Sequence, residues 1–275
     1  MTVSKENRIA VFGDWRIAYE TRPGAEEIPI VFVHGANSDR RIWHRQLAGL
    51  EWQGQLLAID LLGHGESDKP PEYRFGFREL ALGIETVVKS ERLERMVLVG
   101  HSNGVPTVRE YYRLFPEKTA ALVLVDGPIR QPLTDQMAAW LRAQLDSGKE
   151  DMMSTMVQQM PRGELTETDL GLIHQAALAT PLHVMKGGLE ALTDPGTWRQ
   201  DPIQVPVLML VSRGPMQTHW KEENRSLAES MIEELDFQIL NEVTHFFMLE
   251  RASDFNRRLS AFLGHLKQTE EGQIP

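Results

Sequence analysis

The sequence predicts an α/β fold built on a mostly parallel, doubly wound sheet. Short apolar runs rich in Val, Ile and Leu alternate along the chain with segments whose apolar residues recur at helical spacing. Between Pro132 and Gln200 this alternation breaks, because helix-like stretches follow one another with no strand between them. We therefore expect a core made of residues 1–131 and 201–275, with a helical cap of residues 132–200 inserted into it.

The strands are expected in seven segments. NRIAVFG and WRIAYET are typical of an antiparallel start. The more apolar runs that follow are typical of parallel strands buried on both faces, and they are IPIVFVHG, QLLAID, MVLVGHS, AALVLVDG and VPVLMLVS. In such sheets ligands bind beyond the carboxyl ends of the strands, so we expect the functional site at that edge. The polar residues there are His34, Asp60, Ser102 and Asp126.

Composition and charge narrow the class of protein. The 275 residues, with 41% hydrophobic and 25% charged residues, are typical of a globular protein, and the net charge of −10 disfavours nucleic acid or an anionic membrane as a partner. The absence of cysteine excludes disulfides, thiolate chemistry and sulfur-ligated metals. The N-terminus has no apolar signal core, so a soluble cytoplasmic protein is expected. Its expected partner is a small-molecule substrate, and a homodimer is open.

A serine lies between a predicted strand and a predicted helix. The apolar run Met96–Val99 is followed by Gly-His-Ser-Asn-Gly at residues 100–104, and helical spacing begins at Val105. Glycines two residues before and after Ser102 allow a turn so tight that the serine hydroxyl projects clear of the sheet. The helix that follows directs its free N–H groups toward the same place. This pattern is typical of a nucleophilic serine.

The predicted cap is rich in methionine at helical spacing. Such stripes are most often plain core, but the adaptable thioether side chain also suits the underside of a lid over an apolar substrate. A capping box at Thr166 and Asp169 is expected to begin one of its helices. The residues predicted to contact substrate are Trp140, Met156 and Met160.

Four motifs in this order resemble those of the α/β-hydrolase fold superfamily, and the likeness covers nearly the whole chain. VFVHGANSDRRIW resembles the end of the oxyanion-loop strand, and IDLLGHGESDKP resembles the Asp-x-x-Gly-x-Gly-x-Ser loop. VGHSNG resembles the nucleophile turn, and EVTHFFMLERASDFNRRLSAFL resembles the segment with the catalytic histidine. The resemblance implies an α/β-hydrolase fold with an inserted helical cap.

The resemblance also implies the roles of individual residues. Ser102 would be the nucleophile and His245 the base that takes its proton. The backbone N–H groups of Ala36 and Asn103 would form the oxyanion hole. The other polar residues are expected to brace these loops rather than react, and they are His34, Asp60, His64 and His101.

The triad acid is absent from its commonest place in the family. The strand VPVLMLVS is followed by RGPMQTHW, with no carboxylate before Glu222 and Glu223. Asp126, which ends AALVLVD, is the preferred candidate because some branches of the family place their acid there. Glu222 or Glu223, and a Ser–His dyad without an acid, remain the alternatives.

The leading functional prediction is hydrolysis of a carboxylic ester or lactone of an apolar or aromatic small molecule through an acyl-enzyme, with no cofactor and no metal. Zearalenone-type lactonases resemble the chain in combining a serine with an acid on the earlier strand. Cofactor-free dioxygenases of heteroaromatic rings share these features too, and C–C bond hydrolases are a further alternative. A non-catalytic, receptor-like member of the fold is disfavoured by the Ser102 and His245 pair.

Overall fold

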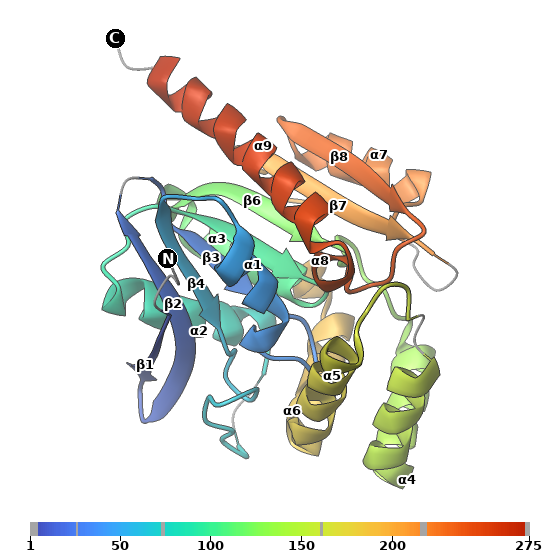
Figure 1. The fold of residues 1–275 in the computed structure, drawn as a ribbon. Helices are drawn as coiled ribbons and strands as arrows, with labels where there is room; N and C mark the ends of the chain where they lie inside the picture. The colour runs from blue at the N-terminus through green and yellow to red at the C-terminus, as the bar shows by residue number, and fades with distance from the viewer. Residues whose placement is uncertain (1–4, 26, 73–74, 160–161, 215–218, 273–275) are drawn as a thin grey trace.

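The protein is described here by a computed structural model that covers residues 5–25, 27–72, 75–159, 162–214 and 219–272. Eight strands form a single sheet in the order β1-β2-β4-β3-β5-β6-β7-β8 (Figure 1). The strands are β1 (Glu6–Phe12), β2 (Trp15–Ala25), β3 (Ile30–Val33), β4 (Gly54–Ile59), β5 (Met96–His101), β6 (Thr119–Val125), β7 (Val207–Arg213) and β8 (Leu235–Asn241). β2 pairs antiparallel with both β1 and β4, and every other pairing is parallel. The expected fold class is confirmed.

Helices cover both faces of this sheet (Figure 1). Side chains alternate between the two faces along β3, so that Val31 and Val33 pack on one face and Ile30 and Phe32 on the other. The first face is covered by α2 (Phe77–Ser90), α3 (Gly104–Leu114) and α7 (Glu222–Met231). The second is covered by α1 (His44–Gly49), α8 (Phe247–Glu250) and α9 (Ala252–Gly272). Both faces are therefore buried, which explains why the parallel strands are continuous apolar runs.

One strand was not among those predicted. β8 lies at the edge of the sheet and pairs only with β7. Its sequence LDFQILN places polar Asp236 and Gln238 between apolar residues, and most of its positions are only partly buried or exposed. An edge strand covered on one face lacks the continuous apolar run by which the central strands were recognised.

The segment between β6 and β7 is helical, with no strand among its described residues. It contains α4 (Asp135–Gln159), α5 (Glu167–Ala179) and α6 (Leu182–Thr193), which project together from one end of the molecule (Figure 1). α4 is interrupted at Gly148, whose backbone is not helical. The predicted capping box at the start of α5 is confirmed, since Thr166 and Asp169 each accept a hydrogen bond from the other's backbone N–H.

Candidate active site

Ser102 lies in the turn between β5 and α3 with a backbone φ of +52°, a left-handed conformation that is strained for a residue other than glycine. The glycines on each side are required by close backbone contacts. A Cβ on Gly100 would lie 2.4 Å from the carbonyl oxygen of Gly104, and a Cβ on Gly104 would lie 2.6 Å from that of Val33. The Gly-x-Ser-x-Gly spacing thus follows from the packing of this turn against β3 and α3.

Asp126 and His245 are joined by a hydrogen bond of 2.7 Å between Oδ2 and Nδ1. Asp126 follows β6 directly, and His245 lies in the loop between β8 and α8. The carboxylate is fully buried and also accepts hydrogen bonds from Ser212, at 2.8 Å from the backbone N–H and 2.7 Å from the hydroxyl. The strands β6 and β7 therefore fix the acid, and the acid fixes the orientation of the imidazole.

The charge of Asp126 is set by two opposing effects. Burial raises the pKa of Asp126, but the hydrogen bond and charge of His245, with the hydrogen bond from Ser212, outweigh burial and hold that pKa below its ordinary value. The carboxylate is therefore ionised at neutral pH. His219, after β7, contributes in the same direction, although no sequence pattern pointed to it.

The backbone around His245 is also fixed by His101. His101 Nε2 lies 2.9 Å from the carbonyl oxygen of His245, so this nitrogen carries a proton and donates a hydrogen bond to that oxygen. The two rings lie 4.5 Å apart between centroids. Burial holds the pKa of His101 well below its ordinary value, so the ring is neutral. As expected, His101 packs beside the serine turn.

Ala36, in the loop after β3, and Asn103, the residue after Ser102, both line one cavity. Within the described chain, neither backbone N–H donates a hydrogen bond. Asn103 immediately precedes α3, so the positive end of the helix dipole lies there as well. Two unpaired N–H groups at a cavity wall are suited to receive a carbonyl oxygen that gains negative charge.

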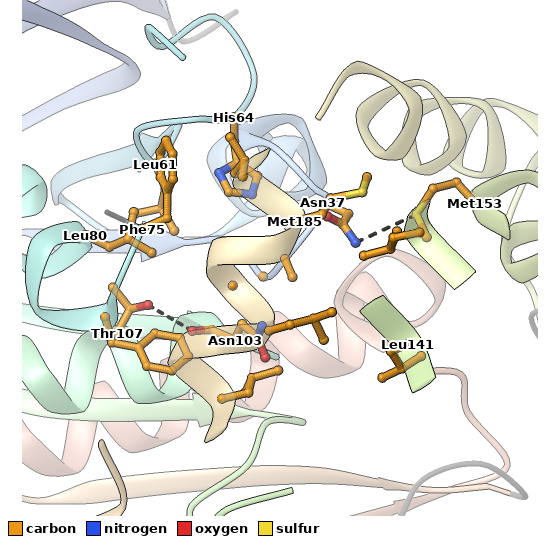
Figure 2. A pocket seen from close by; sticks show the side chains of 18 of the residues that line it. Asn37, Leu61, His64, Phe75, Leu80, Asn103, Thr107, Leu141, Met153 and Met185 are labelled. Carbon is orange, nitrogen blue, oxygen red and sulfur yellow. Dashed lines mark hydrogen bonds between the residues drawn. The ribbon is translucent and has the colours of Figure 1, made fainter. Parts of the chain in front are cut away.

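The cavity has a volume of about 200 Å³ and lies between the core and the helical segment (Figure 2). Its wall is mostly apolar, with polar side chains from Asn37, His64, Asn103 and Thr107. Ser102 and His245 are not among its lining residues, whereas Ala36 and Asn103 are. From the helical segment the lining residues are Leu141, Leu145, Met152, Met153, Val184, Met185, Gly188, Leu189 and Leu192.

His34 and Asp60 brace the loops, as expected from the sequence. The N–H of Leu61 donates to His34 Nε2 at 3.0 Å, so the neutral ring carries its proton on Nδ1, which donates to the Gly35 carbonyl at 2.7 Å. Asp60 is fully buried, accepts from the Arg40 backbone N–H at 2.7 Å and pairs with the Arg40 guanidinium. These contacts hold the loop that carries Ala36.

His64 lines the cavity without a charge. Burial lowers the pKa of His64 to about 3, so the ring is neutral at every pH at which the protein would be assayed. Its ring lies 5.1 Å from that of His34 in an edge-on arrangement. The role expected for His64 as a structural residue fits these contacts.

The structure does not place Trp140, which the sequence analysis expects to contact substrate, at the wall of the cavity. Its side chain is 61% exposed and does not line the cavity, whereas Leu141, the next residue of α4, does. On a helix, adjacent residues point about 100° apart, and the sequence pattern could not show which of them faces inward. Met156 belongs to α4, but its side chain is outside the described part of the structure, and Met160 is outside the described residues altogether.

The alternative acids lie on the surface. Glu223 is exposed and forms an ion pair with Arg130, and Glu222 is exposed at the start of α7. Neither contacts His245 in the described structure. Sequence reasoning missed Ser212, which binds Asp126, since a serine at the end of an apolar strand carries no signal of its own. Nor did it single out Met185, which reaches the cavity from α6.

Two kinds of feature are absent from the described residues. No group of three or more His, Asp or Glu side chains there is arranged to hold a metal ion. None of the helices described there has the length and apolar character needed to cross a bilayer.

Comparison with known proteins agrees with the fold. Residues 30–258 match the model of the alpha/beta hydrolase family, and the chain therefore belongs to that family. A thermophilic esterase from Thermogutta terrifontis superposes with a TM-score of 0.81 at 20% identity, covering 96% of this chain and 99% of the esterase. Est816, described as an N-acyl homoserine lactone degrading enzyme, gives a TM-score of 0.76 at 23% identity, covering 93% of this chain and 100% of Est816. At these identities the likeness shows the fold alone.

Some sequence relatives match over short stretches only. An uncharacterized protein of Mycobacterium tuberculosis is 32% identical over 98 residues, which are 36% of this chain and 28% of that protein. The match thus spans little more than a quarter of the relative's length.

Proposed function

We propose that this protein is a serine hydrolase that cleaves a carboxylic ester or lactone of an apolar or aromatic small molecule through an acyl-enzyme. The observation that carries the proposal is the buried Asp126–His245 hydrogen bond beside the strained Ser102 turn. The cavity with two free N–H groups supports it, because acyl transfer needs a place for the developing oxyanion. No cofactor or metal is required.

In the proposed mechanism, Ser102 Oγ attacks the substrate carbonyl carbon while His245 Nε2 accepts the hydroxyl proton. Asp126 stays ionised, accepts a hydrogen bond from His245 Nδ1 at an Oδ2–Nδ1 distance of 2.7 Å and stabilises the imidazolium. The N–H groups of Ala36 and Asn103 donate to the oxyanion. When the tetrahedral adduct collapses, the ester C–O bond breaks and His245 gives its proton to the leaving alcohol. Water then repeats the sequence at the acyl-enzyme, which releases the acid and restores Ser102.

The size and polarity of the cavity suit a medium-sized acyl group. An engineered apolar cavity of about 150 Å³ is known to bind benzene. A cavity of about 200 Å³ would thus hold an aromatic ring or a chain of roughly six to eight carbons. The esterase and lactone-degrading neighbours act on bonds of the proposed kind, and their similarity to this chain agrees with the proposal.

A cofactor-free dioxygenase is the second candidate, favoured by one observation. Ser212 lies near the end of β7, the strand after which most hydrolases of this family carry their acid, and it binds Asp126, the acid we propose, directly after β6. In that reaction the His245–Asp126 pair would deprotonate a substrate hydroxyl, and the resulting carbanion would meet oxygen. C–C bond hydrolysis would use the same residues.

One substrate panel separates these candidates. Purified protein is given p-nitrophenyl esters of increasing chain length, aliphatic and aromatic lactones, and a hydroxyquinolone with oxygen uptake recorded. We expect turnover of esters or lactones and no oxygen uptake, because the free N–H groups at the cavity suit a tetrahedral oxyanion. Oxygen uptake without ester turnover would replace the hydrolase proposal with the dioxygenase.

Residues 132–200 are proposed to act as a lid over this site. They contribute the apolar half of the cavity wall, from α4 and α6. If the cavity holds the acyl group, a larger side chain at Leu141 should exclude longer chains. We expect Leu141→Phe to lower kcat/KM for an octanoyl ester roughly tenfold relative to the acetyl ester, since even one methylene of misfit matters in an apolar pocket.

The control for this variant is its neighbour in the same helix. Trp140→Ala removes a larger side chain that points to solvent, and the ratio of octanoyl to acetyl kcat/KM should stay at the wild-type value. If the two variants shift the ratio equally, the cavity is not the acyl site.

A further inference from the structure

Glu250 is a buried carboxylate close to His245 in the chain that the proposed mechanism does not use. Glu250, the last residue of α8, is 6% exposed. Its Oε2 accepts a hydrogen bond of 2.6 Å from the N–H of Thr244, the residue before His245. Its Oε1 accepts one of 3.2 Å from the N–H of Glu164, which lies between α4 and α5 in the proposed lid. One side chain therefore contacts both the histidine loop and the lid.

The lid is packed directly on this carboxylate. Gly163 has a left-handed φ of +51°, and a Cβ added to it would lie 2.2 Å from Glu250 Oε1. Only glycine permits the chain to approach this closely. The ion pair between Arg251 and the side chain of Glu164, at 2.9 Å, lies beside it. The contact is thus part of the fold of this loop rather than a chance approach of two surfaces.

A second connection runs in parallel. Arg45 donates to the carbonyl oxygen of Leu249 in α8 at 2.7 Å and to the carboxylate of Asp169 in α5 at 2.7 Å. The segment that follows His245 is therefore joined to the N-terminal end of α5 by both a carboxylate and a guanidinium.

The partners of Glu250 indicate what the carboxylate is for. In the described part of the chain no Lys, Arg or His side chain forms an ion pair with Glu250, and its hydrogen-bond donors are the two backbone N–H groups. A buried carboxylate without a cationic partner adds little stability that an apolar side chain could not supply. Its specific contribution is to accept hydrogen bonds from two backbone N–H groups that belong to segments far apart in the sequence.

We propose that Glu250 is a positioning residue that ties the lid loop at residues 162–164 to the backbone of His245, so that seating of the lid and placement of the base occur together. This inference rests on the proposed function, because it takes His245 to be the base. His101 holds the carbonyl oxygen of His245, in the peptide unit that follows it, and Glu250 holds the N–H of Thr244, in the peptide unit between Val243 and Thr244. Loss of the Glu250 anchor would leave the histidine loop held by the His101 contact and by Asp126, without a tie on the N-terminal side of His245.

Two substitutions test the coupling from its two ends. Glu250→Gln keeps one acceptor oxygen but presents an NH₂ group to the other N–H, so one of the two hydrogen bonds is lost. Gly163→Ala changes only the lid and forces its loop away from the carboxylate. Gly171→Ala is the matched control, because it is in α5 of the same lid and its added Cβ would meet nothing within 4 Å.

The measurements are kcat and KM for a p-nitrophenyl ester, the rate at which a fluorophosphonate labels Ser102, and amide hydrogen exchange at residues 243–246 and 162–166. We expect Glu250→Gln and Gly163→Ala each to lower kcat and the labelling rate roughly tenfold, because a small misplacement of a base is costly, with KM changed by less than about threefold. Exchange at 243–246 should rise in Gly163→Ala, although the substitution is in the lid. Gly171→Ala should match the wild type.

The inference is overturned if Gly163→Ala leaves exchange at 243–246 and kcat unchanged, or if both variants lower only the melting temperature. Its failure is distinguishable from failure of the proposed function. If only the inference fails, Ser102→Ala is still inactive while Glu250→Gln and Gly163→Ala turn over normally. If the proposed function fails, Ser102→Ala stays active, and the exchange data alone then decide whether the lid and the histidine loop are coupled.

Discussion

Ser102→Ala is expected to lower kcat for ester hydrolysis by a factor on the order of 10⁵ to 10⁶, because the proposed mechanism offers no second nucleophile. The substitution removes one oxygen from the turn between β5 and α3. The backbone hydrogen bonds of that turn, from Ser102 N–H to the Val125 carbonyl and from Val105 N–H to the Ser102 carbonyl, do not involve the side chain. The variant should therefore fold with a melting temperature close to that of the wild type.

The measurement is single-turnover and steady-state kinetics with a p-nitrophenyl ester, together with mass spectrometry after exposure to a fluorophosphonate. The wild type should gain one adduct on the peptide that contains Ser102, and the variant should gain none. Ser230→Ala, at an exposed serine of α7, serves as control and should behave as the wild type. Turnover by Ser102→Ala at the wild-type rate would eliminate the acyl-enzyme mechanism and favour the dioxygenase, in which the serine is auxiliary.

Asp126→Asn is expected to lower kcat by roughly three to four powers of ten, with little change in KM. An Asn side chain can still accept the Ser212 backbone N–H through its oxygen. Its NH₂ group would then lie where Oδ2 now accepts from His245 Nδ1. Facing a donor, Nδ1 must become an acceptor, which moves the ring proton to Nε2, the atom that has to accept the proton of Ser102.

Folding should survive this change. Asp126 has a backbone φ of +44°, and asparagine adopts this left-handed region as readily as aspartate does. The check is kcat, KM and melting temperature, with Glu223→Gln as the matched control. Glu223 forms an exposed ion pair with Arg130, so its substitution should cost less than about tenfold in kcat.

Other results would reassign the acid. A large loss in Glu223→Gln or Glu222→Gln with a mild effect of Asp126→Asn would move the acid to the later loop. Mild effects in all three would leave a Ser–His dyad. An Asp126→Asn protein that cannot fold would mean that the carboxylate holds β6 and β7 together and does no more.

The central strands were predictable from the sequence because each is buried on both faces. β3, β5 and β6 are almost entirely apolar, so their periodicity and length are read directly. The serine turn was predictable for a different reason, since the close contacts that exclude a Cβ at Gly100 and Gly104 leave a fixed Gly-x-Ser-x-Gly spacing in the sequence. β8 was missed because it lies at an edge, where polar residues interrupt the pattern.

What depends on long-range packing could not be predicted. Ser212 contacts Asp126 only because β7 lies beside β6 in the sheet, although the two residues are 86 positions apart. The inward face of α4 is set by how it packs on α5 and α6, and its apolar pattern is too weak to distinguish Trp140 from Leu141. The tie between Glu250 and the lid is invisible in the sequence for the same reason.

The three neutral histidines around the site have a thermodynamic consequence for the whole molecule. Burial lowers the pKa of His34, His64 and His101 in the folded protein, whereas each ring has a pKa near 6.5 once the chain unfolds. Unfolding therefore takes up protons at any pH between the folded and the unfolded pKa of a ring. The stability linked to these rings is complete above about pH 6.5, and it is lost as the pH falls toward the folded value of about 3 for His64. For His64 this loss is about 1.4 kcal/mol per pH unit in that interval. Acidity thus acts on the fold through the rings that support the active-site loops.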